Sequence, residues 1–171
     1  GNRERSHWEV IAAESSMVLE LPEQALIHSQ KGIANLSESQ RSSELGQRLL
    51  ITMASAQNRT GNSQDAIKTI NAVITHLESK NLPSWLLVEA LIERSDMYSS
   101  ASNFRAALAD LLRAYALAKP DGKRGMRADV ASYLGNVYMT MSDYALAAKY
   151  YRESTASSIQ RNELVSLSID E

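Results

Sequence analysis

The chain has 171 residues, and 44% of them are apolar, which is enough for one continuous core in a single domain or a short solenoid. Its 18 basic side chains nearly balance its 20 acidic ones, so a formal charge of −2 leaves no basic surface for nucleic-acid binding, and the absence of cysteine excludes disulfides and thiolate chemistry. Charged residues interrupt every apolar segment before it reaches about 18 residues, so we expect no transmembrane helix and no membrane contact by this chain.

Helices are predicted along the whole chain, because no strand-like alternation occurs and the helix breakers fall at junctions. Pro22, Pro83 and Pro120 all lie between predicted helices, and none lies inside one, where proline would cost about 3 kcal/mol. Three serines, Ser63, Ser84 and Ser142, are candidate N-terminal caps or near-caps. In chain order, the predicted helices are 4–20, 22–37, 41–59, 63–80, 84–100, 103–118, 126–141, 143–160 and a last one from about 162.

A repeat runs through these helices. Small residues recur at the same place in the second helix of each pair, with spacings of 41, 41 and 40 residues, and a second set stands twelve residues before them. Such positions are typical of close helix crossings, and a period of about 20–50 residues is typical of a solenoid, in which each repeat packs on its neighbours. The two sets are Ala25, Ala66, Ala107 and Ala147, and Ala13, Ala54, Ser95 and Gly135.

The last complete repeat shows the unit best. Its segment 134–138 reads Leu-Gly-Asn-Val-Tyr and is followed by Tyr-Ala-Leu-Ala-Ala at 144–148, while Tyr98 and the segment 104–108 match it one repeat earlier. This pattern resembles the tetratricopeptide repeat, although the period of about 41 residues exceeds the usual 34 or so. Stretched repeats of this kind resemble those in the sensor and regulator proteins of bacteria.

The resemblance implies an all-α fold, an α-α superhelix of about four helical hairpins with one extra C-terminal helix. We expect a single domain over 1–171, with repeats at approximately 4–37, 41–80, 84–118 and 126–160 and a partial fifth repeat at 162–171.

The two ends of the chain carry expectations of their own. The chain opens at Gly1 rather than at methionine, as an excised or processed protein would, and the helical pattern from 163 stops at the end of the chain. Because solenoid ends need capping, we expect the native protein to continue. The apolar side chains of this last helix predict a homodimer through it. They are Leu164, Val165, Leu167 and Ile169.

The resemblance also implies that the first helix of each pair lines a concave groove, with the groove residues 15, 11 and 8 positions before each key alanine. Val10, Ile51 and Ile92 occupy the first of these positions. Glu89 and Glu93, together with Asp96, lie at i, i+4 and i+7, on one face of a helix, where a basic ligand could bind. The predicted partner-binding residues are Glu89, Ile92, Glu93, Asp96, Tyr133, Asn136 and Met139.

The alternative interpretation of the three carboxylates is an ordinary solvated helix face, whose charge Arg94 and Arg105 or the neighbouring repeats balance. Tetratricopeptide domains that bind chaperone tails use a lysine four residues before an asparagine. Here Asn136 has Ser132 at that place, so chaperone-tail binding is not expected.

No catalytic residue, metal site or cofactor site is predicted. The three histidines have no ligand-like spacing, and no glycine-rich phosphate loop follows a strand. The leading hypothesis is a protein- or peptide-binding helical-repeat module, the sensory or scaffolding region of a larger bacterial signalling protein. The alternative is a cytoplasmic regulator whose repeats bind a peptide or small effector and control an attached DNA-binding or catalytic domain. The compartment stays open, with the lack of cysteine fitting the periplasm slightly better than the cytosol.

Overall fold

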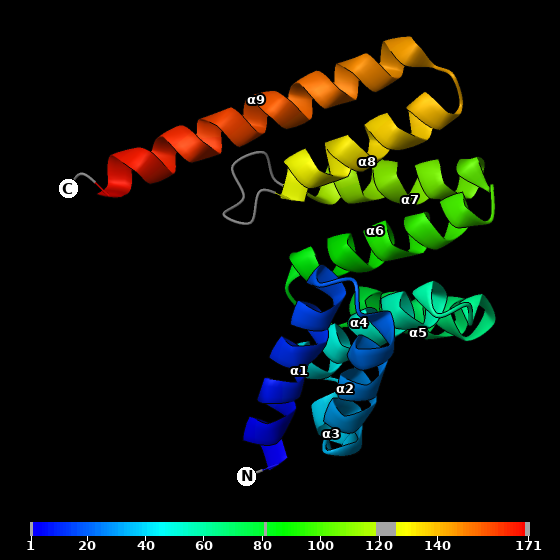
Figure 1. Ribbon diagram of the computed structural model, residues 1–171, viewed down its shortest axis with the longest axis vertical. Helices are drawn as coiled ribbons and strands as arrows, with labels where there is room; N and C mark the ends of the chain where they lie inside the picture. Colours follow the sequence, from blue (N-terminus) through cyan, green and yellow to red (C-terminus); the bar gives the residue numbers. More distant parts are fainter. Residues whose placement is uncertain (1, 81, 119–125, 170–171) are drawn as a thin grey trace.

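The computed structural model describes the backbone of residues 2–80, 82–118 and 126–169, and the side chains of 4–80, 82–118 and 126–156. In this part of the chain every regular element is a helix (Figure 1). The helices are α1 (Asn2–Val18), α2 (Pro22–Ala34), α3 (Glu38–Arg41), α4 (Glu44–Arg59), α5 (Ser63–Ser79), α6 (Ser84–Ser100), α7 (Phe104–Leu117), α8 (Met126–Thr140) and α9 (Tyr144–Ile169).

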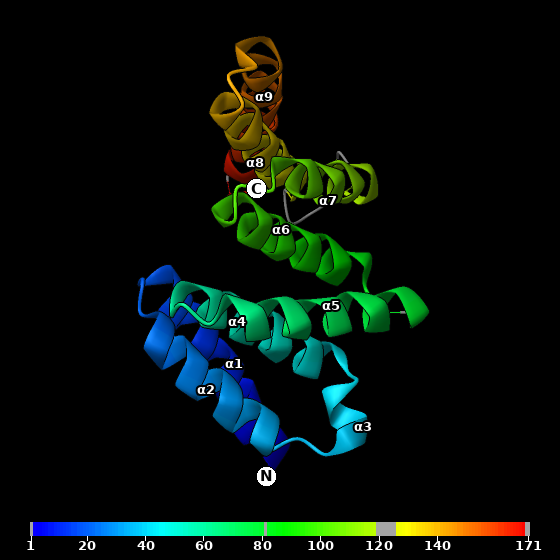
Figure 2. The same cartoon turned by 90° about the vertical axis from the view of Figure 1, so that its right-hand side faces the viewer.

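The helices form antiparallel pairs that stack one upon the next. Each pair contacts the next pair mainly through the first helix of the later pair, and the first helices α1, α4, α6 and α8 also contact one another in that order. Figures 1 and 2 show the stack running from the α1–α2 pair at one end of the molecule to the α8–α9 pair at the other. The all-helical superhelix predicted from the sequence is confirmed.

One backbone geometry recurs at the turn inside every pair. The residues with φ between +57° and +88° in the described chain stand 41, 41 and 40 positions apart, which is the spacing of the key alanines. At each turn the next residue donates its N–H to the carbonyl five residues earlier at 2.8–2.9 Å, the closing bond of a Schellman motif. The four left-handed residues are Glu20, Gly61, Ser102 and Ser142.

The small residues lie where the helices of each pair cross. Ala25, Ala66, Ala107 and Ala147 are all fully buried. At the matching position of α8, a methyl group added to Gly135 would lie 2.6 Å from the ring of Tyr151, so only glycine fits beneath that ring. The predicted helix crossings are therefore confirmed.

The observed helices differ from the predicted ones in two places. α9 runs unbroken from Tyr144 to Ile169, so no separate helix begins near 162, because neither proline nor glycine interrupts the segment. The short helix α3 was not predicted, and the Ser37–Gln40 capping box starts it. The side chains of Leu164, Val165, Leu167 and Ile169 lie outside the described residues, and the homodimer through them stays a prediction.

Candidate functional site

Three first helices bring charged side chains together on the inner face of the stack. α4 contributes Arg59, α6 contributes the carboxylates predicted from the sequence, and α8 contributes an aspartate and a tyrosine. We call the α6 and α8 members the acidic groove. They are Glu89, Glu93, Asp96, Asp129 and Tyr133.

The electrostatics show that these side chains are close neighbours. Burial raises the pKa of Tyr133, and the charges of Glu93, Asp96 and Asp129 raise it further, whereas Arg59 lowers it. Tyr133 comes from α8 and Glu93 from α6, so charged side chains of two successive repeats act on one another here.

Glu93 is the least solvated member of the groove. Burial raises the pKa of its carboxyl, and so does the charge of Asp96, while a hydrogen bond from Ser55 and the charge of Arg59 pull the pKa down. A half-buried carboxyl whose charge is incompletely compensated favours any ligand that brings a positive charge close to it.

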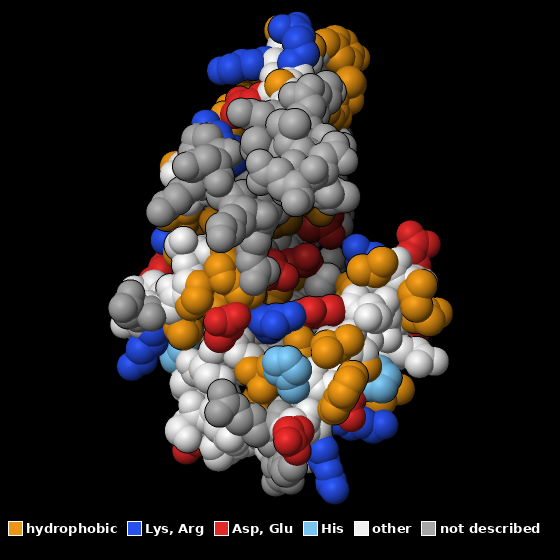
Figure 3. All heavy atoms as spheres, turned by 90° about the vertical axis from the view of Figure 1, so that its left-hand side faces the viewer, with side chains coloured by type: hydrophobic (Ala, Val, Ile, Leu, Met, Phe, Trp, Pro, Cys, Tyr) orange, Lys and Arg blue, Asp and Glu red, His pale blue; other side chains and the backbone are white. Residues whose placement is uncertain are grey.

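A pocket of about 430 Å³ adjoins the acidic groove between α1, α4 and α6. Glu89 and Glu93 form one wall, and Met17, Val18 and Ile51 give the pocket an apolar side. Its remaining lining residues are Glu14, Thr52, Ser55 and Arg59. Figure 3 shows acidic side chains set back in a hollow at mid-height of this face.

The carboxylate on the α1 side of the pocket, Glu14, is already paired with a cation that does not line the pocket. Arg48 donates two hydrogen bonds to Glu14, at 2.9 Å and 2.7 Å, and so joins α4 to α1. Glu14 is thereby neutralised, and the remaining charged side chains of the pocket are Glu89 and Glu93 of α6 and Arg59 of α4.

Ile92 was predicted as an apolar anchor for the partner, but the fold leaves little of its side chain exposed for such a contact. Its side chain is only 8% exposed, and the matching residues Val10 and Ile51 are 1% and 2% exposed. Val10 packs against Leu36, which follows α2, and against Leu49 in the next pair, so this position lies mainly in the core between repeats, although Ile51 also reaches the pocket. The groove position is one residue later, where Thr52, Glu93 and Tyr133 stand.

The other predicted residues on α8 lie toward the end of that helix. Asn136 is exposed, and its amide oxygen accepts a hydrogen bond of 2.7 Å from the Tyr151 hydroxyl. Met139 is 45% exposed and does not line the pocket. Glu93, Asp96 and Tyr133 are thus brought together, with Glu89 beside Glu93 in the pocket wall, whereas Met139 takes part in neither arrangement.

Sequence reasoning missed Asp129. One repeat position, eighteen residues before the key alanines of the later repeats, holds Arg48, Glu89 and Asp129. Because Asp129 shares this position with Glu89, the repeat spacing could have identified Asp129 as a member of the site.

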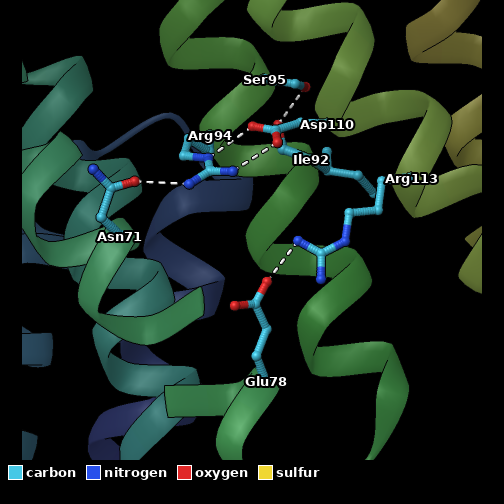
Figure 4. Close-up of polar contacts among 7 residues, drawn as sticks. All are labelled: Asn71, Glu78, Ile92, Arg94, Ser95, Asp110 and Arg113. Carbon is cyan, nitrogen blue, oxygen red and sulfur yellow. Dashed lines mark hydrogen bonds and ion pairs between the residues drawn. The ribbon is translucent and has the colours of Figure 1, made fainter. Parts of the chain in front are cut away.

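Of the two sources of balancing charge that sequence reasoning offered, a neighbouring repeat supplies one, because Arg59 of α4 lowers the pKa of Glu93 and of Tyr133. Arg94 does not balance the groove, because it pairs with buried Asp110 on α7 through two hydrogen bonds of 2.7 Å and donates a third, of 2.8 Å, to Asn71 on α5 (Figure 4).

The described residues hold neither a metal-binding cluster nor a membrane-spanning helix. They contain no group of three or more His, Cys, Asp or Glu side chains placed to hold a metal ion. None of the helices among them combines the length and the apolar character that crossing a bilayer requires.

Comparison with known proteins gives a fold and no family. No family model matches the chain, and no curated protein matches it in sequence. Among solved structures, the chain is similar to the crystal structure of MamA, a tetratricopeptide-like helical repeat protein, with a TM-score of 0.62 and 14% identity over 92% of this chain and 81% of that one. The likeness supports a tetratricopeptide-like helical repeat fold.

Proposed function

We propose that the acidic groove binds a segment of a partner protein that carries a basic side chain. The observation that carries the proposal is the gathering of Glu93, Asp96 and Asp129 around one partly exposed tyrosine, with Glu89 beside Glu93 in the wall of the adjoining pocket. A lysine or arginine beside them would relieve the raised pKa of Glu93, since a neighbouring positive charge stabilises the carboxylate.

Tyr133 supplies the second element of recognition. It is 40% exposed, so its ring is accessible beside the carboxylates, and a cation over such a ring gains about 0.5–1 kcal/mol at an exposed site. Electrostatic complementarity of this kind selects a basic segment over an acidic one.

A peptide pair tests the proposal. A labelled peptide of alternating arginine and alanine should bind the chain, and its glutamate–alanine counterpart should not. Replacing Asp96 with Asn or Tyr133 with Ala should weaken binding about fivefold or more, the loss of roughly 1 kcal/mol expected for an interface contact. Glu23→Gln, an exposed carboxylate on α2, is the matched control and should leave the affinity unchanged.

Equal affinity for the two peptides would contradict the proposal. So would an affinity that neither Asp96→Asn nor Tyr133→Ala changes, because binding would then take place elsewhere.

For the biological setting, we propose the sensory or scaffolding region of a larger bacterial signalling protein, supported by the resemblance of the stretched repeats. The alternative is a cytoplasmic regulator whose repeats bind a peptide or small effector and control an attached DNA-binding or catalytic domain. The full-length gene product separates them: a signal segment and membrane helix would favour the first, and a helix-turn-helix the second. An enzymatic role for the groove has no observation in its favour.

A further inference from the structure

The pocket beside the acidic groove has two walls of different chemistry. Met17 and Val18, the last two residues of α1 listed among its lining, form an apolar side together with Ile51 of α4, and Glu89 and Glu93 of α6 form the acidic wall. Val18 is 83% exposed, whereas Ile51 is 2% exposed and lines the pocket from the side of the core. Figure 3 shows hydrophobic side chains beside the hollow in which the acidic side chains lie. The pocket therefore offers an apolar surface and carboxylates to the same ligand.

The charges that line the pocket favour a cation as this ligand. Three carboxylates line it, those of Glu14, Glu89 and Glu93, against one guanidinium, that of Arg59. Arg48 neutralises Glu14 from beside the pocket. An anion would therefore face the acidic wall of α6, whereas a cation complements it.

A purely apolar side chain and a short cation each match only half of this lining. An apolar side chain would take Glu93 further out of water without a partner, which is unfavourable for a carboxylate. A short cation would leave Met17 and Ile51 without a contact. The side chains of lysine and arginine match both walls, because their methylene stems pack along apolar surface while the charged group stays at polar neighbours.

We propose that this pocket receives one long basic side chain of the partner segment, with its stem against Met17 and Ile51 and its charged group at Glu93. The inference rests on the function proposed above, and it adds a second contact of the same segment to the one at Tyr133. Glu93 belongs to both contacts, since it lines the pocket and its charge also acts on Tyr133 of the next repeat.

The packing of the helices sets the spacing of the two basic side chains along the partner. The pocket lies between α4 and α6, and Tyr133 stands on α8, whose neighbour among the first helices is α6. Packed helices are roughly 8–10 Å apart, and an extended chain advances about 3.3 Å per residue. The partner segment therefore carries its two basic residues about two or three positions apart, and it crosses the first helices in an extended form.

A set of three labelled peptides tests the inference with the chain as it is. Each peptide carries an arginine for the contact at Tyr133 and, three residues away, lysine, norleucine or diaminopropionic acid. Norleucine keeps the stem and lacks the charge, whereas diaminopropionic acid keeps the charge and lacks most of the stem. Fluorescence anisotropy should show that the lysine peptide binds about fivefold or more tightly than either of the others. Each peptide is made in both orders, so that either direction of the segment along the groove is sampled.

A variant of the apolar wall locates the stem. Met17→Ala should weaken the lysine peptide about threefold or more, and it should weaken the diaminopropionic acid peptide less, because only the longer stem reaches the apolar wall. Met141→Ala, which removes a 48% exposed methionine between α8 and α9, is the matched control and should leave both affinities unchanged. Thermal melts check that both variants fold.

Three outcomes would overturn the inference. Equal affinity of the lysine and norleucine peptides would show that the pocket takes an apolar side chain, and equal affinity of the lysine and diaminopropionic acid peptides would show that only charge is recognised. Equal effects of Met17→Ala on all three peptides would place the stem elsewhere. Each of these results leaves the proposed function standing, since that function fails only if the arginine–alanine and glutamate–alanine peptides bind alike or if neither Asp96→Asn nor Tyr133→Ala changes the affinity.

Discussion

At the scale of single residues, the sign of the Glu93 titration follows from its surroundings. Burial raises the pKa of this carboxyl above its ordinary 4.5, so the folded chain binds this proton more tightly than the unfolded chain does. The stabilising contribution of the protonated group is complete below pH 4.5 and is lost as the pH rises through the folded pKa.

Glu93→Gln should therefore be more stable than the wild type at neutral pH, and the difference should vanish in acid. Thermal melts of both chains across this pH range measure the effect, and Glu23→Gln on the exposed face of α2 is the control. A stability difference that is independent of pH would show that Glu93 is better solvated than its position indicates.

The crossing alanines give a second prediction at this scale. Ala147 is fully buried and Ala145, two residues earlier on α9, is exposed. Ala147→Leu should cost about 1–3 kcal/mol in the free energy of unfolding, since added methylenes force a packed crossing apart. Ala145→Leu should stay within about 0.5 kcal/mol. Urea denaturation measures both, and equal stabilities would mean that the crossing lies elsewhere.

At the scale of helices, two ion pairs of the third repeat differ in strength: Arg94–Asp110 joins its two helices α6 and α7, and Arg113–Glu78 joins α7 to α5 of the preceding repeat. Arg94 and Asp110 are 18% and 9% exposed, whereas Arg113 and Glu78 are 45% and 41% exposed (Figure 4). Asp110→Ala leaves a guanidinium partly buried without its main acceptor and should cost about 3 kcal/mol or more. Glu78→Ala should cost at most about 1 kcal/mol, because solvent screens an exposed pair. Denaturant titrations measure both variants, and similar losses in the free energy of unfolding for Asp110→Ala and Glu78→Ala would contradict this ranking.

The turns inside the pairs give the next prediction. Ser102 and Ser142 have φ values of 58° and 63°, a region that costs a non-glycine residue roughly 1–2 kcal/mol. Ser102→Gly should therefore raise the free energy of unfolding by up to about 1 kcal/mol, while Gly61→Ala should lower it. Thermal melts that order these variants the other way would show that the serine side chain compensates for the strain.

At the scale of the whole molecule, the acidic groove should control the response of binding to solution conditions. Affinity for the arginine–alanine peptide should fall with added salt, since ions screen solvated charges, and should fall further as acid protonates Glu93. Titrations at several salt concentrations and pH values measure both effects. Salt-independent binding would indicate that the contact is mainly apolar.

The sequence predicted the architecture because a single spacing recurs in it. The alanine positions defined the register, and the register placed most helix ends within three residues of the observed ones. The turn geometry at Gly61 and Ser102 follows the same spacing. The continuous α9 was not predicted, because the change of pattern near 162 was taken for a helix boundary although no breaker stands there.

The candidate site was predictable only in part. Glu93 and Tyr133 share a repeat position, so a correct register brings them together. Ile92 is more buried than expected, because the apolar stripe of a first helix packs both on its own partner and on the next repeat, and the sequence does not show how wide that stripe is. The partner of Arg94 depends on which neighbouring helix its side chain reaches, and that direction follows only from the packing of α5, α6 and α7.

The recurring turn has a consequence for how the molecule can change its length. Gly61 and Ser102 have the same backbone geometry, and the residues after them, Asn62 and Asn103, cap the following helices in the same way. Removing residues 62–102 would join Gly61 to Asn103 and recreate the same turn at the junction. Inserting a copy of that segment would do the same. The module that can be added or removed is therefore the segment from the turn of one helical hairpin to the turn of the next. Adding or removing it would change the length of the stack and keep the same turn at the junction.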